Sequence, residues 1–217
     1  MIGSTFSFAS EFVSTKVAMA LALEIEIETA TLLARFKGVE PAGEMRGVLF
    51  EAYAARKLAE GGKFTVREVA TGTTTVLELG KTSILQKDTK KLNMTQFPPA
   101  AITGKFVWPN PDYNLPTIDA FMQHMFTLIA HQMTISTSHP VNLDGAKAFL
   151  QYFDSVMRKL GRAVPASYTL YFAVPAVVFD KFSQSVQSIT GANGTVLHTE
   201  EAKKIAARIS QYVLKVE

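Results

Sequence analysis

The chain has 217 residues, 47% of them hydrophobic, with no cysteine and a formal net charge of +3. This length is enough for one well-buried core and an appended element. The absence of cysteine excludes disulfides, thiolate nucleophiles and cysteine-built zinc sites. A sequence pI of about 9.0 permits a polyanionic partner such as nucleic acid but does not require one.

The N-terminal stretch predicts a helix, because residues 9–37 are rich in Ala, Leu, Met and Glu and contain no proline. The Glu-Ile alternation over residues 24–28 favours a strand instead. Its three carboxylates make a transmembrane segment costly, so we expect no membrane partner. Glycine and proline over residues 38–43 mark a boundary. We therefore expect an N-terminal helical extension at 1–40 and one folded domain at 41–217.

The first part of the predicted domain is a helix followed by a hairpin. Residues 44–60 favour a helix that ends at two glycines. Residues 63–69 and 75–79 alternate in polarity and predict two antiparallel strands. The basic stretch at 86–91 is either a solvated turn or a contact to a phosphodiester backbone.

Residues 95–118 carry five prolines, which predicts a long shaped loop without helix. Within and just after it, residues 113–119 form a short strand-like run that ends on an acidic residue, Asp119. The next strand-like run covers residues 127–136.

Alternation along the second run predicts which side chains share a face. His131, Met133 and Ile135 point one way, whereas Gln132, Thr134 and Ser136 point the other. If the two runs are neighbours, the carboxylate of Asp119 meets the Gln132/Thr134 pair at one edge of the sheet. A satisfied polar pair in the core is the alternative interpretation of Gln132 and Thr134.

The remaining elements alternate helix and strand, which indicates an α/β protein with a central mixed sheet flanked by helices. We expect an amphipathic helix at 144–161, a buried strand at 168–174, a short helix at 175–182, a strand around 186–190, a helix capped by Thr199, and either a last strand or a helix end at 211–217.

Four spaced blocks carry a family resemblance. They are Arg46–Glu51, Leu115–Phe121, Gln132–Ser136 with His139-Pro140, and Leu170–Pro175. The chain resembles, over roughly residues 44–217, the C-terminal nuclease-like domain of Crinkler effectors and the related retrotransposon hot spot proteins, which are assigned to the PD-(D/E)XK phosphodiesterase superfamily. The resemblance implies a restriction-endonuclease-like core.

The resemblance also implies a Mg²⁺ or Mn²⁺ site. In that superfamily a strand acid holds the metal, an acid or amide on the next strand completes the shell, and a helix Glu assists. Asp119, Gln132 and Glu51 match these three roles in turn. Hard oxygen ligands and retained waters suit Mg²⁺ chemistry. By its spacing alone, Glu51 is a surface carboxylate paired with Arg56 or Lys57.

One position departs from the superfamily pattern. The place usually held by a catalytic lysine is Thr134, which carries no charge. Losing one preorganised charge typically costs roughly 3–4 kcal/mol at the transition state unless another group replaces it. Replacement candidates are His139, as an acid or base, and Lys105 or Lys147. His139 alternatively bonds a loop carbonyl.

Two functions follow from these observations. The first is a metal-dependent nuclease acting on DNA. The second is a catalytically inactive nucleic-acid-binding or protein-binding domain on the same scaffold. The resemblance further implies a secreted effector that acts inside a host cell, in the nucleus, and whose upstream translocation region and NTPase module stand outside this sequence. A Ser-His-Asp triad built on Ser136 or Ser138 lacks a nucleophile-elbow sequence.

Overall fold

The computed structural model describes residues 43–87, 92–109 and 117–217. The chain divides into two units, Met1–Tyr53 and Ala54–Glu217. The predicted extension at 1–40 lies outside the described residues, and so does most of the predicted strand before Asp119. The α/β class with a mixed sheet and a few helices is confirmed in the second unit.

Helix α3, Gly43–Glu60, confirms the first predicted helix and begins in the first unit. It ends where the sequence places two glycines, and Gly61 has φ 74°. A Cβ at Gly61 would lie 2.6 Å from the carbonyl oxygen of Leu79. Only glycine fits this close approach without a shift of the backbone, so the chain turns directly from α3 into the first strand.

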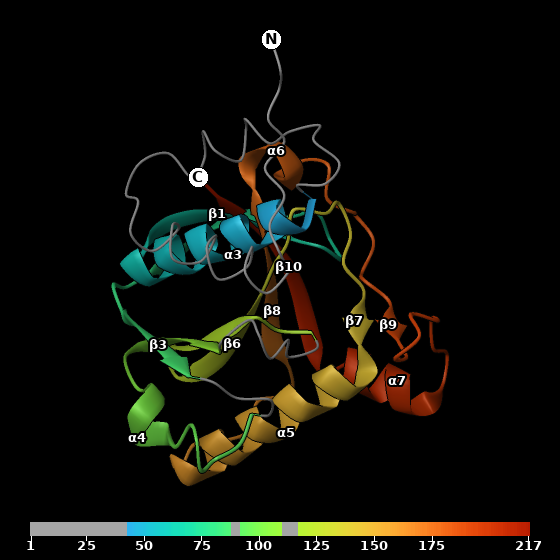
Figure 1. Cartoon of the computed structure of the whole chain (residues 1–217). Coiled ribbons are helices and arrows are strands. Elements are labelled where there is room, and N and C mark those ends of the chain that lie inside the picture. The colour runs from blue at the N-terminus through green and yellow to red at the C-terminus, as the bar shows by residue number, and fades with distance from the viewer. Residues whose placement is uncertain (1–42, 88–91, 110–116) are drawn as a thin grey trace, which may run out of the picture. The chain divides into compact units, whose positions relative to one another are not determined.

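Within the described residues, one curled sheet holds eight strands in the order β2-β1-β10-β8-β6-β5-β4-β3 (Figure 1). The strands are Gly62–Glu68 (β1), Thr74–Leu79 (β2), Ser83–Lys87 (β3), Lys105–Pro109 (β4), Ala120–His124 (β5), Thr127–Met133 (β6), Tyr168–Pro175 (β8) and Ile209–Val216 (β10). Strands β6, β8 and β10 are parallel neighbours, whereas β5 runs antiparallel to both β4 and β6. The ends of β6, β8 and β10 therefore share one edge with the start of β5.

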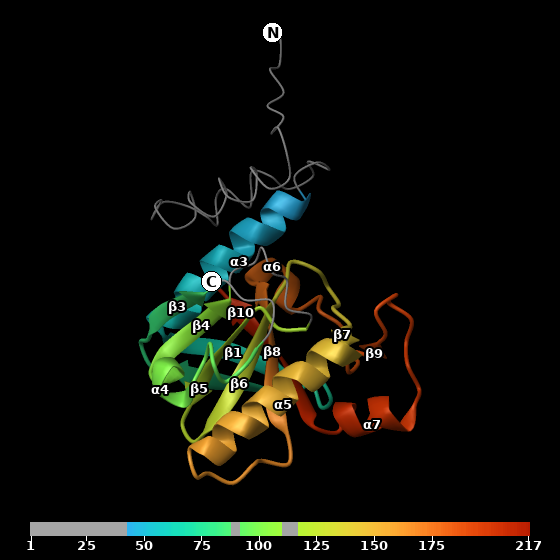
Figure 2. The ribbon, with the colours of Figure 1, turned by 60° about the horizontal axis from the view of Figure 1, so that its bottom comes forward.

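Helices cover the sheet of the second unit. They are α4 (Pro99–Ile102), α5 (Leu143–Lys159), α6 (Ala176–Phe179) and α7 (Glu200–Ala206), and a small sheet pairs β7 (Val141–Asn142) with β9 (Ile189–Thr190). Figure 2 shows α5 running along one face of the large sheet. Its apolar side packs there because Phe149, Phe153 and Val156 are buried in the main core cluster. None of the helices described is long and apolar enough to cross a membrane.

The alternation predicted for β6 is confirmed as far as the strand extends. Leu128 and Ala130 belong to the core cluster beside α5. On the opposite face the His131 ring lies between Phe106 and Tyr171, with ring centroids 5.5 and 5.6 Å away. The strand ends at Met133. The predicted continuation to residue 136 is therefore wrong.

The proline-rich stretch contains more regular structure than the sequence predicts. Residues 99–102 form α4, because Pro98 and Pro99 occupy the start of a helix, where a missing N–H costs little. Residues 105–109 form β4, whose Phe106, Val107 and Trp108 are all buried. The prediction of a helix-free loop is thus wrong here. Burial between neighbouring strands outweighs the low strand preference of the flanking prolines.

Other differences are smaller. Residues 86 and 87 belong to β3 and not to a loop, while 88–91 lie outside the described residues. The strand expected around 186–190 is only the two-residue β9. The helix expected at 144–161 and the strand at 168–174 are confirmed as α5 and β8. The C-terminal segment is a strand, β10, and not a helix end.

Candidate functional site

Asp119 and Gln132 meet at the sheet edge where β6 ends. Asp119 directly precedes β5, so the expectation that it ends a strand is wrong. The antiparallel register pairs Ala120 with His131, which places Asp119 opposite Gln132. The main-chain N–H of Asp119 donates to the carbonyl of His131 at 2.8 Å. The structure thus brings together the two residues that the sequence predicts to converge.

Two N–H groups orient the Asp119 carboxylate. The Gln132 amide Nε2 donates to Asp119 Oδ2 at 2.8 Å, and the main-chain N–H of Met133 donates to the same oxygen at 2.6 Å. Gln132 is 7% exposed and is the last residue but one of β6. These two donors tie the carboxylate to the strand next to its own.

The amide oxygen of Gln132 bears on metal binding. Gln132 Oε1 is buried and has no hydrogen-bond partner. An unpaired buried acceptor costs free energy, and an amide oxygen beside a carboxylate suits a hard cation. A 180° rotation of the amide exchanges Oε1 and Nε2. The same side chain can therefore donate to Asp119, as here, or turn its oxygen toward a cation beside Asp119. Asp119 and Gln132 therefore fit a divalent cation that keeps most of its waters.

The rest of a metal shell is sparse in this unit. Among residues 43–87, 92–109 and 117–217, no group of three or more His, Cys, Asp or Glu side chains is placed to hold a metal ion. Glu51 lies on α3 in the first unit, and its role as a third ligand stays a prediction. Arg56 and Lys57, its expected surface partners, form ion pairs with Glu60 at 3.9 and 3.8 Å.

Thr134 follows β6 and is 8% exposed. Its main-chain N–H donates to the carbonyl of Ala173 in β8 at 3.0 Å. Its hydroxyl oxygen accepts the N–H of Ser136 at 3.1 Å. Thr134 therefore fixes the turn after β6 and brings no positive charge.

His139 lies close to the same edge. Its main-chain N–H donates to Gln187 Oε1 at 2.9 Å. Its ring centroid lies 6.5 Å from that of Phe172, and Phe172 pairs in register with Gln132. Burial lowers the pKa of His139, so its imidazole is neutral at pH 7. A neutral imidazole can accept a proton.

The two candidate replacement lysines have other partners. Lys105 opens β4 next to the end of β5 that lies farthest from Asp119, since Phe106 pairs with Met122. Its ammonium donates to Ser83 Oγ at 2.6 Å. The ammonium of Lys147 pairs with Glu201 at 2.7 Å. His139 is thus the replacement candidate that the structure keeps near Gln132.

A buried glutamine pair that the sequence does not single out supports His139. The N–H of Gln187 donates to Gln211 Oε1 at 2.7 Å, and Gln211 Nε2 donates back to the carbonyl of Gln187 at 3.1 Å. Both residues are less than a tenth exposed. This pair ties the loop before β9 to β10 and so holds the acceptor for His139. A single glutamine has no periodic pattern in the sequence that would reveal such a contact.

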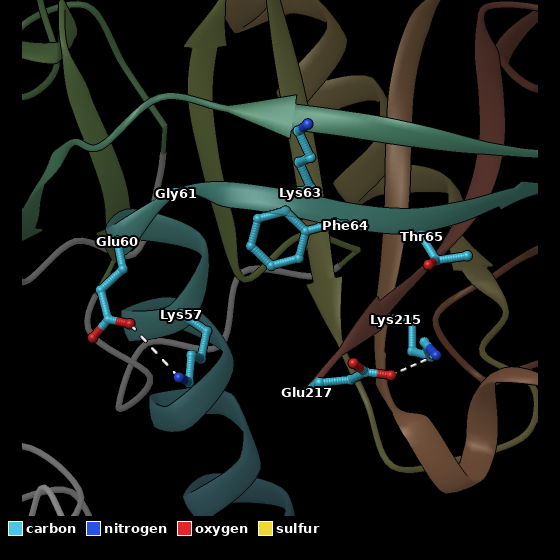
Figure 3. A pocket seen from close by; sticks show the side chains of 8 residues that line it. All are labelled: Lys57, Glu60, Gly61, Lys63, Phe64, Thr65, Lys215 and Glu217. Atoms are coloured by element: carbon cyan, nitrogen blue, oxygen red, sulfur yellow. Dashed lines mark ion pairs between the residues drawn. The ribbon is translucent and has the colours of Figure 1, made fainter.

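An open cavity of about 220 Å³ lies elsewhere on the unit, where β1 begins and β10 ends (Figure 3). It is lined by Lys57, Glu60, Gly61, Lys63, Phe64, Thr65, Lys215 and Glu217. Lys57 pairs with Glu60 at 3.8 Å and Lys215 with Glu217 at 2.5 Å. These ion pairs offset two of the three ammonium charges, so the cavity is a weaker anion site than three lysines suggest.

Comparison of the chain with protein-family models, with curated proteins and with solved structures found no match.

Proposed function

We propose that the chain is a metal-dependent phosphodiesterase that acts on DNA and has a restriction-endonuclease-like core. The observation that carries the proposal is the 2.8 Å hydrogen bond between Gln132 and Asp119. It joins a carboxylate and an amide from neighbouring strands at a single sheet edge. These are the residue types and the placement that the superfamily resemblance requires for its metal shell.

The order of elements supports the same proposal. An acid directly before β5, an amide near the end of β6, the helix α5 and the strand β8 follow one another along the chain. β5 and β6 are antiparallel, while β6 and β8 are parallel neighbours. This arrangement is the one expected of a restriction-endonuclease-like core.

The residues at the edge have separable roles in this proposal. A bound Mg²⁺ or Mn²⁺ would supply an acidified water and offset charge on the phosphate. Asp119 and the oxygen of Gln132 would hold that ion, and the N–H of Met133 keeps the carboxylate in place. His139, neutral because burial lowers its pKa, would be the group that accepts the proton of the attacking water.

Plasmid nicking by the purified chain, with Mg²⁺, Mn²⁺ or EDTA, tests the proposal. Asp119→Asn keeps the shape of the side chain but removes its charge, so we expect cleavage to fall at least about 100-fold. Asp144→Asn is the matched control, because Asp144 is an exposed acid in the first turn of α5. Cleavage that persists in Asp119→Asn and depends on metal would overturn the assignment of Asp119.

A catalytically inactive DNA-binding domain is the second candidate. It is favoured by Thr134, which is neutral and whose hydroxyl accepts the N–H of Ser136. In this case the wild-type chain binds DNA in Mg²⁺ without cleaving it. Thr134→Lys then tests the scaffold: metal-dependent cleavage gained by this variant indicates that only the lysine is lacking. Efficient cleavage by the wild-type chain would eliminate this candidate.

A further inference from the structure

The turn between β5 and β6 exposes two large apolar side chains. His124 pairs with Thr127, so Met125 and Phe126 alone form the loop of the hairpin. Met125 is 77% exposed and Phe126 is 80% exposed. They are the two most exposed large hydrophobic residues in the described part of the chain. We refer to this pair as the hairpin tip.

Met125 and Phe126 are unusual residues for a tight turn. Two-residue hairpin loops favour Asn and Gly, which tolerate positive φ. Met125 instead adopts φ 51°. A positive φ in a non-glycine residue costs on the order of 1 kcal/mol. Neither turn geometry nor burial therefore explains why an apolar pair stands here.

Basic side chains lie beside the hairpin tip, near the end of α5. The guanidinium carbon of Arg162 lies 6.0 Å from the centroid of the Phe126 ring. Arg158 and Lys159, in the last turn of α5, are exposed. Figure 2 shows the end of α5 beside the turn that joins β5 to β6. The nearest acid along α5, Asp154, is bound by Arg208 at 2.8 and 3.0 Å and also pairs with Arg158 at 3.8 Å, so it offsets part of the charge of Arg158.

We propose that the hairpin tip and the end of α5 form a binding site for single-stranded DNA. Phe126 stacks on an unpaired base, with Arg162 beside its ring, and Arg158 and Lys159 contact phosphates. Aromatic rings flanked by cations bind single strands because every base has a stacking face and every linkage a negative charge. In duplex DNA each base is already stacked on both faces, so it is not free to stack on Phe126. Two apolar side chains are too few to anchor a protein on a lipid surface.

The position of the hairpin tip complements the proposed catalytic edge. It lies at the opposite end of β5 from Asp119, six residues away, which is about 20 Å along an extended strand. A single strand bound at the tip can therefore extend toward Asp119. The inference shares the DNA partner of the proposed function, but it does not depend on cleavage.

Fluorescence anisotropy with a labelled 20-base oligonucleotide tests the site. Phe126→Ala is expected to raise the Kd for single-stranded DNA about tenfold through loss of stacking, whereas Phe126→Tyr keeps the wild-type affinity. Val76→Ala is the control, because Val76 is 65% exposed and lies on β2, the edge strand on the other side of the sheet from β5 and β6. Equal affinity of wild type and Phe126→Ala would overturn the proposal.

Three further comparisons separate the alternatives. Phe126→Leu should bind as poorly as Phe126→Ala; wild-type affinity in Phe126→Leu overturns base stacking. Lys159→Gln should reduce the slope of log K against log salt by about 0.7.

Tighter binding to single-stranded RNA, or to phosphatidylserine vesicles, than to DNA overturns the choice of partner. Binding that depends on Phe126 in a chain that does not cleave DNA retains this site and refutes the phosphodiesterase.

Discussion

Two aspartates in the second unit show how differently one fold can treat a carboxylate. Asp154 on α5 accepts two hydrogen bonds from Arg208, at 2.8 and 3.0 Å, and one from Tyr168 at 3.0 Å. Burial opposes its ionisation, but the hydrogen bonds from Arg208 and Tyr168 hold the pKa of Asp154 below its usual range. Its charge is offset within the protein, so it stabilises the packing of α5.

Asp119 has a different environment. The Gln132 amide and the main-chain N–H of Met133, both uncharged, donate to one of its oxygens. Next to it, the oxygen of Gln132 is buried without a hydrogen-bond partner. Burial alone therefore does not describe the environment of a carboxylate. Arg208 and Tyr168 hold the carboxylate of Asp154, whereas the donors of β6 hold that of Asp119 and leave an unused amide oxygen beside it.

The largest expected effect separates the two aspartates by activity. Asp119→Asn should lower metal-dependent cleavage at least about 100-fold, which is about 3 kcal/mol in activation free energy. Asp154→Asn should leave cleavage within about threefold, because its neighbours are Arg208 and Tyr168. Single-turnover rates at saturating Mg²⁺ measure both. Similar losses of cleavage in the two variants would contradict a role in cleavage that Asp119 has and Asp154 lacks.

Removing the guanidinium tests the structural role of Asp154. Arg208→Ala leaves a largely buried carboxylate without its main partner, and Arg208 itself is 31% exposed. After allowance for that solvent screening, we expect the free energy of unfolding to fall by roughly 2–3 kcal/mol. Urea unfolding measures it. The double variant Arg208→Ala/Asp154→Asn should recover part of the loss; no recovery would mean that packing by the Arg208 chain dominates.

A buried histidine next to Gln132 in β6 predicts an effect of pH on stability. Desolvation, with a smaller contribution from His124, lowers the pKa of His131 to about 3, and its ring lies against Phe106 and Tyr171. Between that pKa and about 6.5 the unfolded chain binds a proton that the folded chain does not. Stability is therefore full above pH 6.5 and falls as the pH decreases toward 3.

Between pH 8 and pH 5 this difference amounts to roughly 2 kcal/mol in the free energy of unfolding. Urea unfolding in EDTA measures it without a contribution from bound cations. His131→Leu should flatten the dependence, since Leu neither titrates nor needs a partner. A variant with an unchanged pH profile would assign the effect to other groups.

The smallest expected effect concerns the helix that borders the candidate site. The Asn142 side chain caps α5 by accepting the N–H of Gly145 at 3.0 Å. Asn142→Ala should lower the free energy of unfolding by about 1 kcal/mol. Thr117 still donates to the carbonyl of residue 142 in this variant, so cleavage should be unchanged. Thr199→Ala, at the cap of α7, gives the matched measurement away from Asp119.

Much of the fold could be predicted because its signals are local. The amphipathic spacing that places Phe149, Phe153 and Val156 on one side of a helix is a property of α5 alone. The apolar run of β8 predicts a strand buried on both faces, and its burial pattern agrees. The convergence of Asp119 and Gln132 was also predictable, because alternation and closeness in sequence both favour it.

The remaining features depend on contacts between distant segments. β4 forms in a proline-rich stretch because its neighbours β3 and β5 bury Phe106 and Trp108. The ion pair of Asp154 and Arg208 joins residues 54 positions apart. Neither segment has a local pattern that indicates its partner.

By itself, the sequence determined the α/β class, the α5 and β8 segments, and the pair of polar residues that lie at the end of β6. Only the tertiary structure decided that Asp119 precedes β5, that Thr134 fixes a turn, and that Lys105 lies at the end of β4 away from Asp119. The physical reason is that periodicity records which face of an element is buried. Register, charge neutralisation and the distance between side chains arise only when strands far apart in the sequence pair.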